Sequence, residues 1–309
     1  MTSISTIDAA AFSASAIPGR CYYDQRPTCQ LYELLPFIPI QGHELRINVA
    51  PSSALGTFAD AEDAGGALAQ NWPSLTTRSF ELVRISAELP VDGIITGVYG
   101  ADNALLDTLV RIKVEAVRDR FKVMLFAGDP SINAAECLGL RRLVETVTLL
   151  SVRANSGAGG TVLAGEVEAL LALISTRWAG SDLYLVMHAK AYRHLLRHNY
   201  REVEFGRHSQ LGWIPVISGV PVLIDNFIPT NVNVGFGENT TSIYAVILGE
   251  NHGLCGIHPA ANPGGDILVR GPSIKSTSDA EWFHASWDVG IALYNGGALA
   301  RLDGVQHAN

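Results

Sequence analysis

The sequence lacks the marks of several common protein classes. Its 309 residues contain only four cysteines, too few and too scattered for a disulfide scaffold, so synthesis in a reducing cytoplasm is expected. No apolar run approaches the ~18 residues that a membrane-spanning helix needs, which predicts no membrane partner. The N-terminus shows no basic region followed by an apolar core, so no signal peptide is expected.

Lysine, and charge in general, are also scarce. Only 17% of the residues are charged, and lysine occurs four times, at positions 113, 122, 190 and 275. Acidic residues outnumber basic ones by 30 to 22, and the net charge of −8 argues against a nucleic-acid-binding surface. A monomer whose whole surface faces water usually carries more charge, so the low fraction predicts that other subunits cover part of it.

Apolar residues and a long helical pattern are what the sequence does have. Hydrophobic residues make up 48% of the chain, enough for one large or two small domain cores. Residues 101–128 predict a single spine helix, which Asp102 or Asn103 caps and which Gly128-Asp129-Pro130 ends. Charged residues of largely alternating sign form one ridge, at Asp107, Arg111, Glu115, Arg118 and Lys122. The apolar arc opposite is too wide for one partner, so structure is expected along both flanks.

The segments before this helix predict two features that reach out to neighbours. Residues 1–27 are rich in Ser, Thr and Ala and could not order themselves alone, so this arm is expected to lie on a neighbouring subunit. A short helix is expected over 28–37. Two strands, 43–50 and 78–89, enclose a stretch rich in Gly, Ala, Ser and Asp, which predicts a long flap that grips a partner.

The segments after the helix predict an α/β unit. Residues 143–153 have strand character, and a Gly-rich loop leads to Thr161, which is expected to cap a helix through about Arg177. The remaining expectations are a strand at 182–188, a helix at 190–198, extended segments at 213–218, 220–225, 242–249, 253–258 and 266–270, and a last pair of strands within 281–302.

Three groups of residues have the composition of chemical sites without the spacing. His188, His194 and His198 lie close together in the sequence, and His194 and His198 share one helix face. A zinc-peptidase helix has a Glu between its two histidines, but here the spacer is Leu-Leu-Arg, which favours surface or core histidines. The loop within 151–161 lacks the Gly-Lys-Ser/Thr that holds a phosphate. Cys255 and its neighbour His258 follow no strained elbow, which disfavours a catalytic dyad. No catalytic residue, cofactor or metal ligand is predicted.

Cys21 and Cys29 lie in or beside the arm, and two interpretations of them stay open. Both are small buried hydrophobes, or one of them forms an inter-subunit disulfide once an assembled particle meets an oxidising medium. Tyr22, Tyr23 and Trp72 are expected to contact a neighbouring subunit. Base stacking is disfavoured because no basic residues interleave with them near Trp72.

The order of these elements, with a set of local motifs, resembles a known family. The motifs are Leu138-Gly139-Leu140, Gly159-Gly160-Thr161, Trp213-Ile214-Pro215-Val216, Gly219-Val220-Pro221-Val222-Leu223 with Asp225 and Ile228-Pro229, Ser242–Gly249 and Trp287–Ala292. Over about residues 28–305 the chain resembles the tailed-phage major capsid proteins of the Hong Kong 97-type fold, an α+β fold. The resemblance implies an N-terminal arm (1–27), a short helix region (28–39), an extended β loop (40–90), a peripheral domain (91–154 and 286–309, with the spine helix 101–128) and an α/β axial domain (155–285).

The same resemblance implies a structural protein and not an enzyme. The subunit would self-assemble through pentamers and hexamers into the icosahedral head shell of a tailed phage, enclosing double-stranded DNA without sequence-specific binding. It would belong to a virion assembled in the host cytoplasm. Cement proteins stay open as partners, and scaffolding is expected to be a separate protein because the arm is short. Self-crosslinking from a loop lysine is not expected, because residues 43–90 contain none.

Two alternatives stay open. An encapsulin-type nanocompartment shell shares this fold and encloses an enzyme cargo instead of DNA. A soluble metal-dependent hydrolase is more remote, because it would need a convergent site that the sequence does not show.

Overall fold

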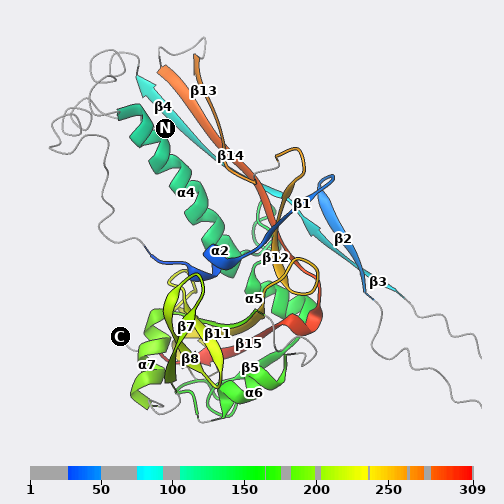
Figure 1. Ribbon diagram of the computed structural model, residues 1–309, viewed down its shortest axis with the longest axis vertical. Coiled ribbons are helices and arrows are strands. Elements are labelled where there is room, and N and C mark those ends of the chain that lie inside the picture. Colours follow the sequence, from blue (N-terminus) through cyan, green and yellow to red (C-terminus); the bar gives the residue numbers. More distant parts are fainter. Residues whose placement is uncertain are drawn as a thin grey trace, which may run out of the picture.

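A long helix and three β-sheets dominate the structure (Figure 1). The computed structural model describes residues 27–49, 75–92, 105–163, 165–174, 182–198, 203–235, 237–262, 265–274 and 280–307. These residues form the mixed α+β chain that the sequence predicted. Among them, no helix combines the length and the apolar character that crossing a membrane requires.

Helix α4, Leu105–Ala127, is the predicted spine. Its first half packs on the long strand β4, Val83–Asp92, through a small separate core around Leu89 and Val91. Its second half enters the main core, where Phe121 is fully buried. The helix therefore has partners on two flanks, as its wide apolar arc predicted.

The turn after α4 depends on a close approach between backbones. The N–H of Gly128 donates to the carbonyl of Met124 (2.8 Å), and the N–H of Gly139 donates to the carbonyl of Gly128 (2.9 Å). A Cβ at Gly128 would lie 2.5 Å from the carbonyl oxygen of Cys137, and a Cβ at Gly139 would lie 2.6 Å from the nitrogen of Gly128. Both distances are shorter than real Cβ contacts, so these positions require glycine.

The five-stranded sheet is a long ribbon that runs beside α4 (Figure 1). Strand β14, Ala280–Leu293, pairs antiparallel with the whole of β4 on one side and with β13, Leu268–Ile274, on the other. Strand β12, Leu254–Pro259, pairs with the end of β14, and β1, Phe37–Ile40, adds in parallel at the edge. Strand β1 was not predicted, and it tolerates Pro39 because it lies at the edge of the sheet.

The single strand predicted over 78–89 is wrong. The chain forms β3, Thr76–Glu81, and then β4, and it changes partner at Leu82, whose N–H donates to the carbonyl of His43 (2.9 Å). Strand β3 pairs with β2, Glu44–Val49, to form the two-stranded sheet. Apolar residues alternate with polar ones at Phe80 and Leu82 and again from Val83 to Leu89, and the phase shifts between Leu82 and Val83, where the partner changes.

The eight-stranded sheet forms the second large unit, with its helices at the lower end of the view (Figure 1). In spatial order its strands are β5 (Ser151–Arg153), β15 (Leu299–Val305), β11 (Gly237–Ile247), β6 (Leu183–Met187), β9 (Val220–Ile224), β8 (Gly212–Ile217) and β7 (Val203–His208), with β10 (Val232–Val234) paired to β11. Two helices belong to this unit, α6 (Glu166–Ala172) and α7 (Ala189–His198). The strand predicted at 182–188 and the helix predicted at 190–198 are confirmed as β6 and α7.

The strand predicted over 143–153 is wrong for most of its length. Leu140–Leu143 form helix α5 and Val144–Thr148 form a π-helical turn, η2, which leaves only β5 as strand. Helical spacing places Arg142 beside Glu145, and the two side chains form an ion pair at 3.0 Å. The β-branched residues here favour a strand locally, but charge pairing and tertiary packing favour the helical form.

The helix predicted over 161–177 begins later than expected. Helix α6 starts after Gly165, whose φ of 84° lies in the left-handed region that glycine adopts readily. The carboxylate of Glu166 accepts the backbone N–H groups of Ser156 (2.8 Å) and Leu163 (2.9 Å). Glu166 therefore ties the Gly-rich loop to the start of the helix, the role that the prediction gave to Thr161.

The predicted domain boundaries do not follow the sheets. The limit between residues 285 and 286 cuts β14 inside its pairing with β4, and β4 itself was largely assigned to the 40–90 loop. Strand β15, assigned to the peripheral segment 286–309, lies in the eight-stranded sheet. Antiparallel strands pair residues that are far apart in the chain, so local patterns could not place these limits. The peripheral and axial roles themselves stay predictions.

Candidate assembly surfaces

The base of the predicted flap is a two-stranded ribbon that leaves the body of the molecule (Figure 1). At its root Phe80 is buried, whereas Leu75 at the far end is 60% exposed. An isolated two-stranded ribbon is marginally stable in water, so its outer part calls for a partner surface. Residues 50–74, which include Trp72, lie outside the described residues, and the predicted contact of Trp72 stays a prediction.

The root of the predicted arm is tied to the eight-stranded sheet at the end of β9. The N–H of Asn226 donates to the carbonyl of Thr28 (3.0 Å), and the side-chain carbonyl of Gln30 accepts the N–H of Ile224 (2.7 Å). Helix α2, Gln30–Leu34, follows and is shorter than the predicted 28–37. The segment that follows the predicted arm is therefore anchored to the eight-stranded sheet.

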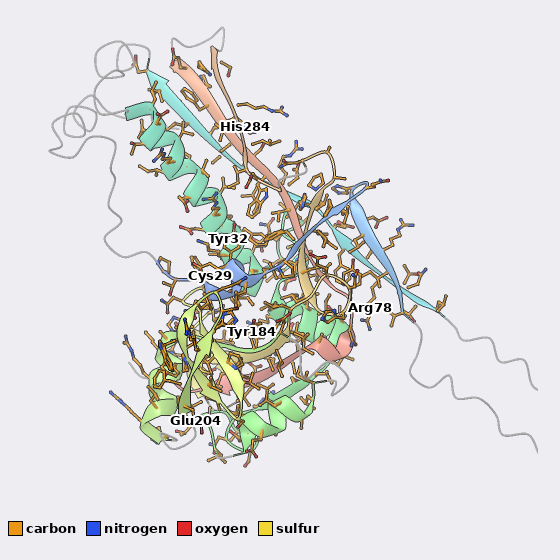
Figure 2. The ribbon with its side chains drawn as sticks, viewed as in Figure 1. Cys29, Tyr32, Arg78, Tyr184, Glu204 and His284 are labelled. Carbon is orange, nitrogen blue, oxygen red and sulfur yellow. The ribbon has the colours of Figure 1, made fainter. Side chains whose placement is uncertain are left out.

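Cys29, Asp225 and Lys122 form a buried polar cluster at this root, where Figure 2 labels Cys29 and Tyr32. Asp225 is fully buried, and burial raises the pKa of its carboxyl to about 7, although the Cys29 thiol, the N–H of Phe227 (3.0 Å) and the charge of Lys122 oppose that rise. The ammonium of Lys122 lies 5.5 Å from the ring centre of Tyr32. The cluster joins the arm root, the sheet and the spine at one point, a role that the sequence analysis missed.

The position of Cys29 bears on its two interpretations. The side chain is 4% exposed, and burial, followed by the charge of Asp225, raises the pKa of its thiol well above the usual range. A buried, protonated thiol does not exchange with a neighbour. This favours the small core residue at Cys29. Cys21, Tyr22 and Tyr23 lie outside the described residues, so a disulfide at Cys21 and the contacts of both tyrosines stay predictions.

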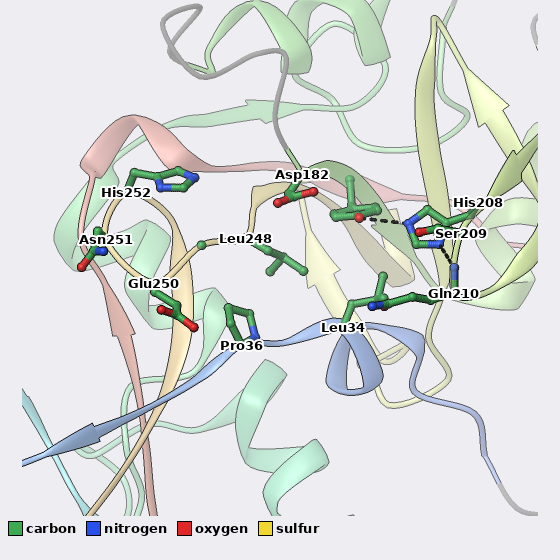
Figure 3. A pocket seen from close by; sticks show the side chains of 12 residues that line it. Leu34, Pro36, Asp182, His208, Ser209, Gln210, Leu248, Glu250, Asn251 and His252 are labelled. Atoms are coloured by element: carbon green, nitrogen blue, oxygen red, sulfur yellow. Dashed lines mark hydrogen bonds between the residues drawn. The ribbon is translucent and has the colours of Figure 1, made fainter. Parts of the chain in front are cut away.

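A cavity of about 520 Å³ opens between α2, the start of β6 and two turns of the eight-stranded and five-stranded sheets (Figure 3). Its hydrogen-bonding side chains include Asp182, Tyr184, His208, Glu250 and His252. Nδ1 of His208 accepts the N–H groups of Gln210 (3.3 Å) and Leu211 (3.2 Å), so the ring proton sits on Nε2. That Nε2–H therefore donates to the hydroxyl of Tyr184 (3.1 Å). The wall holds hydrogen-bonding groups without a nucleophile and base in contact.

The residues considered for catalysis or metal binding do not form such sites. Cys255 and His258 are three positions apart on β12, and alternation along a strand points them to opposite faces. Nδ1 of His188 accepts the N–H of Lys190 (3.0 Å), and burial followed by nearby cations lowers the pKa of His188 to about 4. His188 is thus the neutral N-cap of α7. Among the described residues no three His, Cys, Asp or Glu side chains are grouped to hold a metal.

Several large apolar side chains face solvent on the subunit and were missed as contacts. Phe205 on β7 is 65% exposed and Trp213 on β8 is 73% exposed. The pairing of Phe205 with Pro215 and of Trp213 with Arg207 puts both aromatic rings on one face of this hairpin. Exposed apolar clusters of this kind mark interaction sites.

Comparison with solved structures finds the same fold in chains of other proteins. No protein-family model and no curated protein matches the sequence. A solved structure of the holo-SrpI encapsulin complex from Synechococcus elongatus PCC 7942 contains a chain that is 18% identical, with a TM-score of 0.70, covering 100% of this chain and 99% of that one. The capsid of a native GTA particle gives 16% identity and a TM-score of 0.66 over 96% of this chain and 98% of that chain.

A phage structure extends the comparison. A chain of Microbacterium phage Oxtober96 is 14% identical, with a TM-score of 0.56 over 97% of this chain and 99% of that chain. Identities at this level show the fold alone, and they show it over nearly the whole chain. The protein has the Hong Kong 97-type fold, as the order of its elements predicted.

Proposed function

We propose that this chain is the structural subunit of a closed icosahedral shell that it builds by self-assembly through pentamers and hexamers. The observation that carries the proposal is the match of nearly the whole chain to a chain of an encapsulin complex and to the capsid of a GTA particle. An enzymatic role finds no support in the groupings of nucleophiles, bases and metal ligands among the described residues.

The unpartnered surfaces of the subunit support the same proposal. The described part of the flap ribbon joins the body at Leu82 and exposes Leu75, the arm root is fixed to the sheet, and the Phe205–Trp213 hairpin exposes its aromatic rings. Repetition of one heterologous contact closes a shell when each subunit offers both halves of that contact. The low charge of the chain fits a surface that copies of itself cover.

For the contents of the shell we infer double-stranded DNA, which makes the chain the major capsid protein of a tailed-phage virion assembled in the host cytoplasm. Support comes from the capsids of the GTA particle and of the phage among its structural neighbours. The encapsulin-type shell with an enzyme cargo is the second candidate. It is favoured by the full-length match and the TM-score of 0.70 with the encapsulin chain. Cement and separate scaffolding proteins would be further partners of the phage shell.

Expression of the full chain, followed by size-exclusion chromatography and negative-stain electron microscopy, tests the shell. Closed particles of uniform diameter are expected, and a monomeric elution profile at concentrations of several mg/mL, without particles, would contradict the proposal. The contents are tested on particles from native source material after external nuclease treatment. Protected DNA supports the phage shell, whereas a stoichiometric second protein without DNA supports the encapsulin-type shell.

Deletion of residues 1–27 separates assembly from folding. We expect the truncated chain to keep its circular dichroism spectrum and to form weaker particles, because the partners of the arm are other subunits. Loss of secondary structure in the isolated subunit would show instead that the arm belongs to the fold of one chain.

A further inference from the structure

Helix α7, Ala189–His198, presents a cationic face on a chain that is acidic as a whole, with Arg193 and Arg197 exposed and Lys190 half-buried. Lys190, Arg193 and Arg197 follow one another at spacings of three and four, which places their side chains on one side of the helix. Ala191 and Leu195 are buried against the sheet on the other side. Nitrogen-tipped side chains project from this edge of the molecule, at the left of the view (Figure 2).

None of these cations is neutralised within the described part of the subunit. The sequence of α7 contains no acidic residue, and no ion pair joins Lys190, Arg193 or Arg197 to a carboxylate among the described residues. His188 and His194, which lie beside these cations, are affected by the same positive charges. The pKa of His188 and that of His194 are lowered by burial first and then by neighbouring cations, and no carboxylate contributes to either shift. The local field is positive.

The arrangement is unfavourable for the helix by itself. Lys190 stands in the first turn, where the helix dipole favours an anion. Lys190 and Arg193 are three apart and Arg193 and Arg197 are four apart, and like charges at these spacings repel each other. An anion bound along this face would relieve both effects.

The face also lacks what a protein partner needs. None of the large apolar side chains that are exposed in the described residues belongs to α7. A protein–protein interface has an apolar centre inside a polar rim, and here only the charges are present. A polyanion requires no apolar centre. From Lys190 to Arg197 the cations span about 10 Å of helix, whereas duplex DNA presents one negative charge for about every 1.7 Å of its axis.

We propose that Lys190, Arg193 and Arg197 on α7 form a binding site for the phosphate backbone of double-stranded DNA. The site contacts phosphates and does not read bases, because lysine and arginine side chains of this reach meet phosphates in any register. It deepens the proposed function, and rests on it for its role, by naming the surface through which the shell subunit would hold enclosed DNA. The affinity itself does not depend on shell formation.

The test compares two variants of the full chain that lose the same charge. K190Q/R193Q/R197Q removes the α7 face, and glutamine keeps the helix propensity. R111Q/R153Q/R270Q is the matched control, because these three exposed arginines lie on α4, β5 and β13 and make no ion pair among the described residues. Binding of a fluorescein-labelled 30-base-pair duplex of mixed sequence is measured by anisotropy, on protein diluted until light scattering shows no particles.

We expect the α7 variant to bind the duplex at least 10-fold more weakly at 100 mM NaCl, with the slope of log K against log salt smaller by about 2–3, while the control stays within 2-fold of the original chain. Equal losses in the two variants, or no DNA binding by the original chain, would overturn the site. If the α7 variant loses particle formation and keeps DNA affinity, the face is an inter-subunit contact and the inference is wrong. If the proposed shell function is wrong, the original chain forms no particles, and the difference in DNA affinity between the two variants is unaffected.

Discussion

Helices α4 and α7 both carry many charges, but the two helices use them in opposite ways. On α4, Arg118 pairs with Glu115 at 2.6 Å and Lys122 pairs with Asp119 at 2.8 Å, each three residues apart. On α7 the cations have no acidic neighbour on the helix and no carboxylate partner in the described part of the chain. Arg118 and Lys122 stabilise the subunit by pairing with carboxylates of their own helix, whereas open cations like those of α7 suit a polyanion.

The site proposed on α7 departs from an expectation drawn from composition. The net charge of −8 argued against any surface for nucleic acid, but it is an average over the whole chain. Lys190, Arg193 and Arg197 are few among the 22 basic residues, and their effect comes from their spacing and from the absence of acids between them. Charge that matters for binding is local, because salt screens fields beyond about 10 Å.

The largest effect is expected where α4 is fixed in the core. Gly128→Ala places a Cβ 2.5 Å from the carbonyl oxygen of Cys137, a backbone atom that cannot move without shifting the turn after α4. We expect a loss of about 3 kcal/mol or more in the free energy of unfolding, or failure to fold. Urea denaturation measures it, with K190Q/R193Q/R197Q as the comparison, which should change stability by less than about 1 kcal/mol. Similar losses of unfolding free energy in the two variants would show that the α7 cations matter as much for stability as the turn after α4.

The second largest effect is expected at Asp225, which is buried near Lys122 of α4. The pKa of Asp225 rises from its ordinary 3.8 to about 7 on folding, so the folded state holds this proton more tightly than the unfolded state. Its contribution to stability is therefore fully present below about pH 4 and is lost as pH rises through about 7.

Asp225→Asn removes that dependence. Relative to the original chain, the variant should gain on the order of 2–4 kcal/mol in the free energy of unfolding between pH 4 and pH 8. Denaturation midpoints of both chains across this pH range measure it. A constant difference between the two chains at every pH would show that Asp225 does not titrate as its burial implies.

The smallest effect on stability is expected from a substitution that gives α7 ion pairs like those of Arg118 and Lys122 on α4. Arg193→Glu creates ion pairs with Lys190 three residues before it and Arg197 four residues after it. We expect a gain of about 0.3–1 kcal/mol in the free energy of unfolding, together with loss of duplex binding. Thermal denaturation at low salt and duplex anisotropy measure the two properties. A variant that is less stable would indicate that α7 already has an anionic partner within the subunit.

Local patterns predicted the elements whose stability is local. The periodicity of residues 101–128 and their glycine terminator predicted α4, and alternation with turn residues predicted the paired strands that became β2, β8, β9 and β11. The order of these elements was enough to identify the fold. The missed elements are those that a distant partner decides, such as η2, where Glu145 meets the buried Arg301 at 3.2 Å.

The candidate surfaces divide in the same way. The basic residues of α7 stand in the sequence without an acid between them, so this local charge could be predicted from the sequence. The cluster of Cys29, Asp225 and Lys122 had no such signal, since its members come from three separate segments.

The sequence by itself determined the spine, the order of helices and strands, and the type of fold, because helix periodicity and strand alternation act between residues that are neighbours in the chain. Only the tertiary structure decided that Cys29 is buried against Asp225, that β14 passes through the predicted domain limit, and that Arg118 and Lys122 of α4 are paired while the cations of α7 have no ion-pair partner among the described residues. Burial and charge pairing depend on which distant residues meet, and one chain's local pattern does not contain that information.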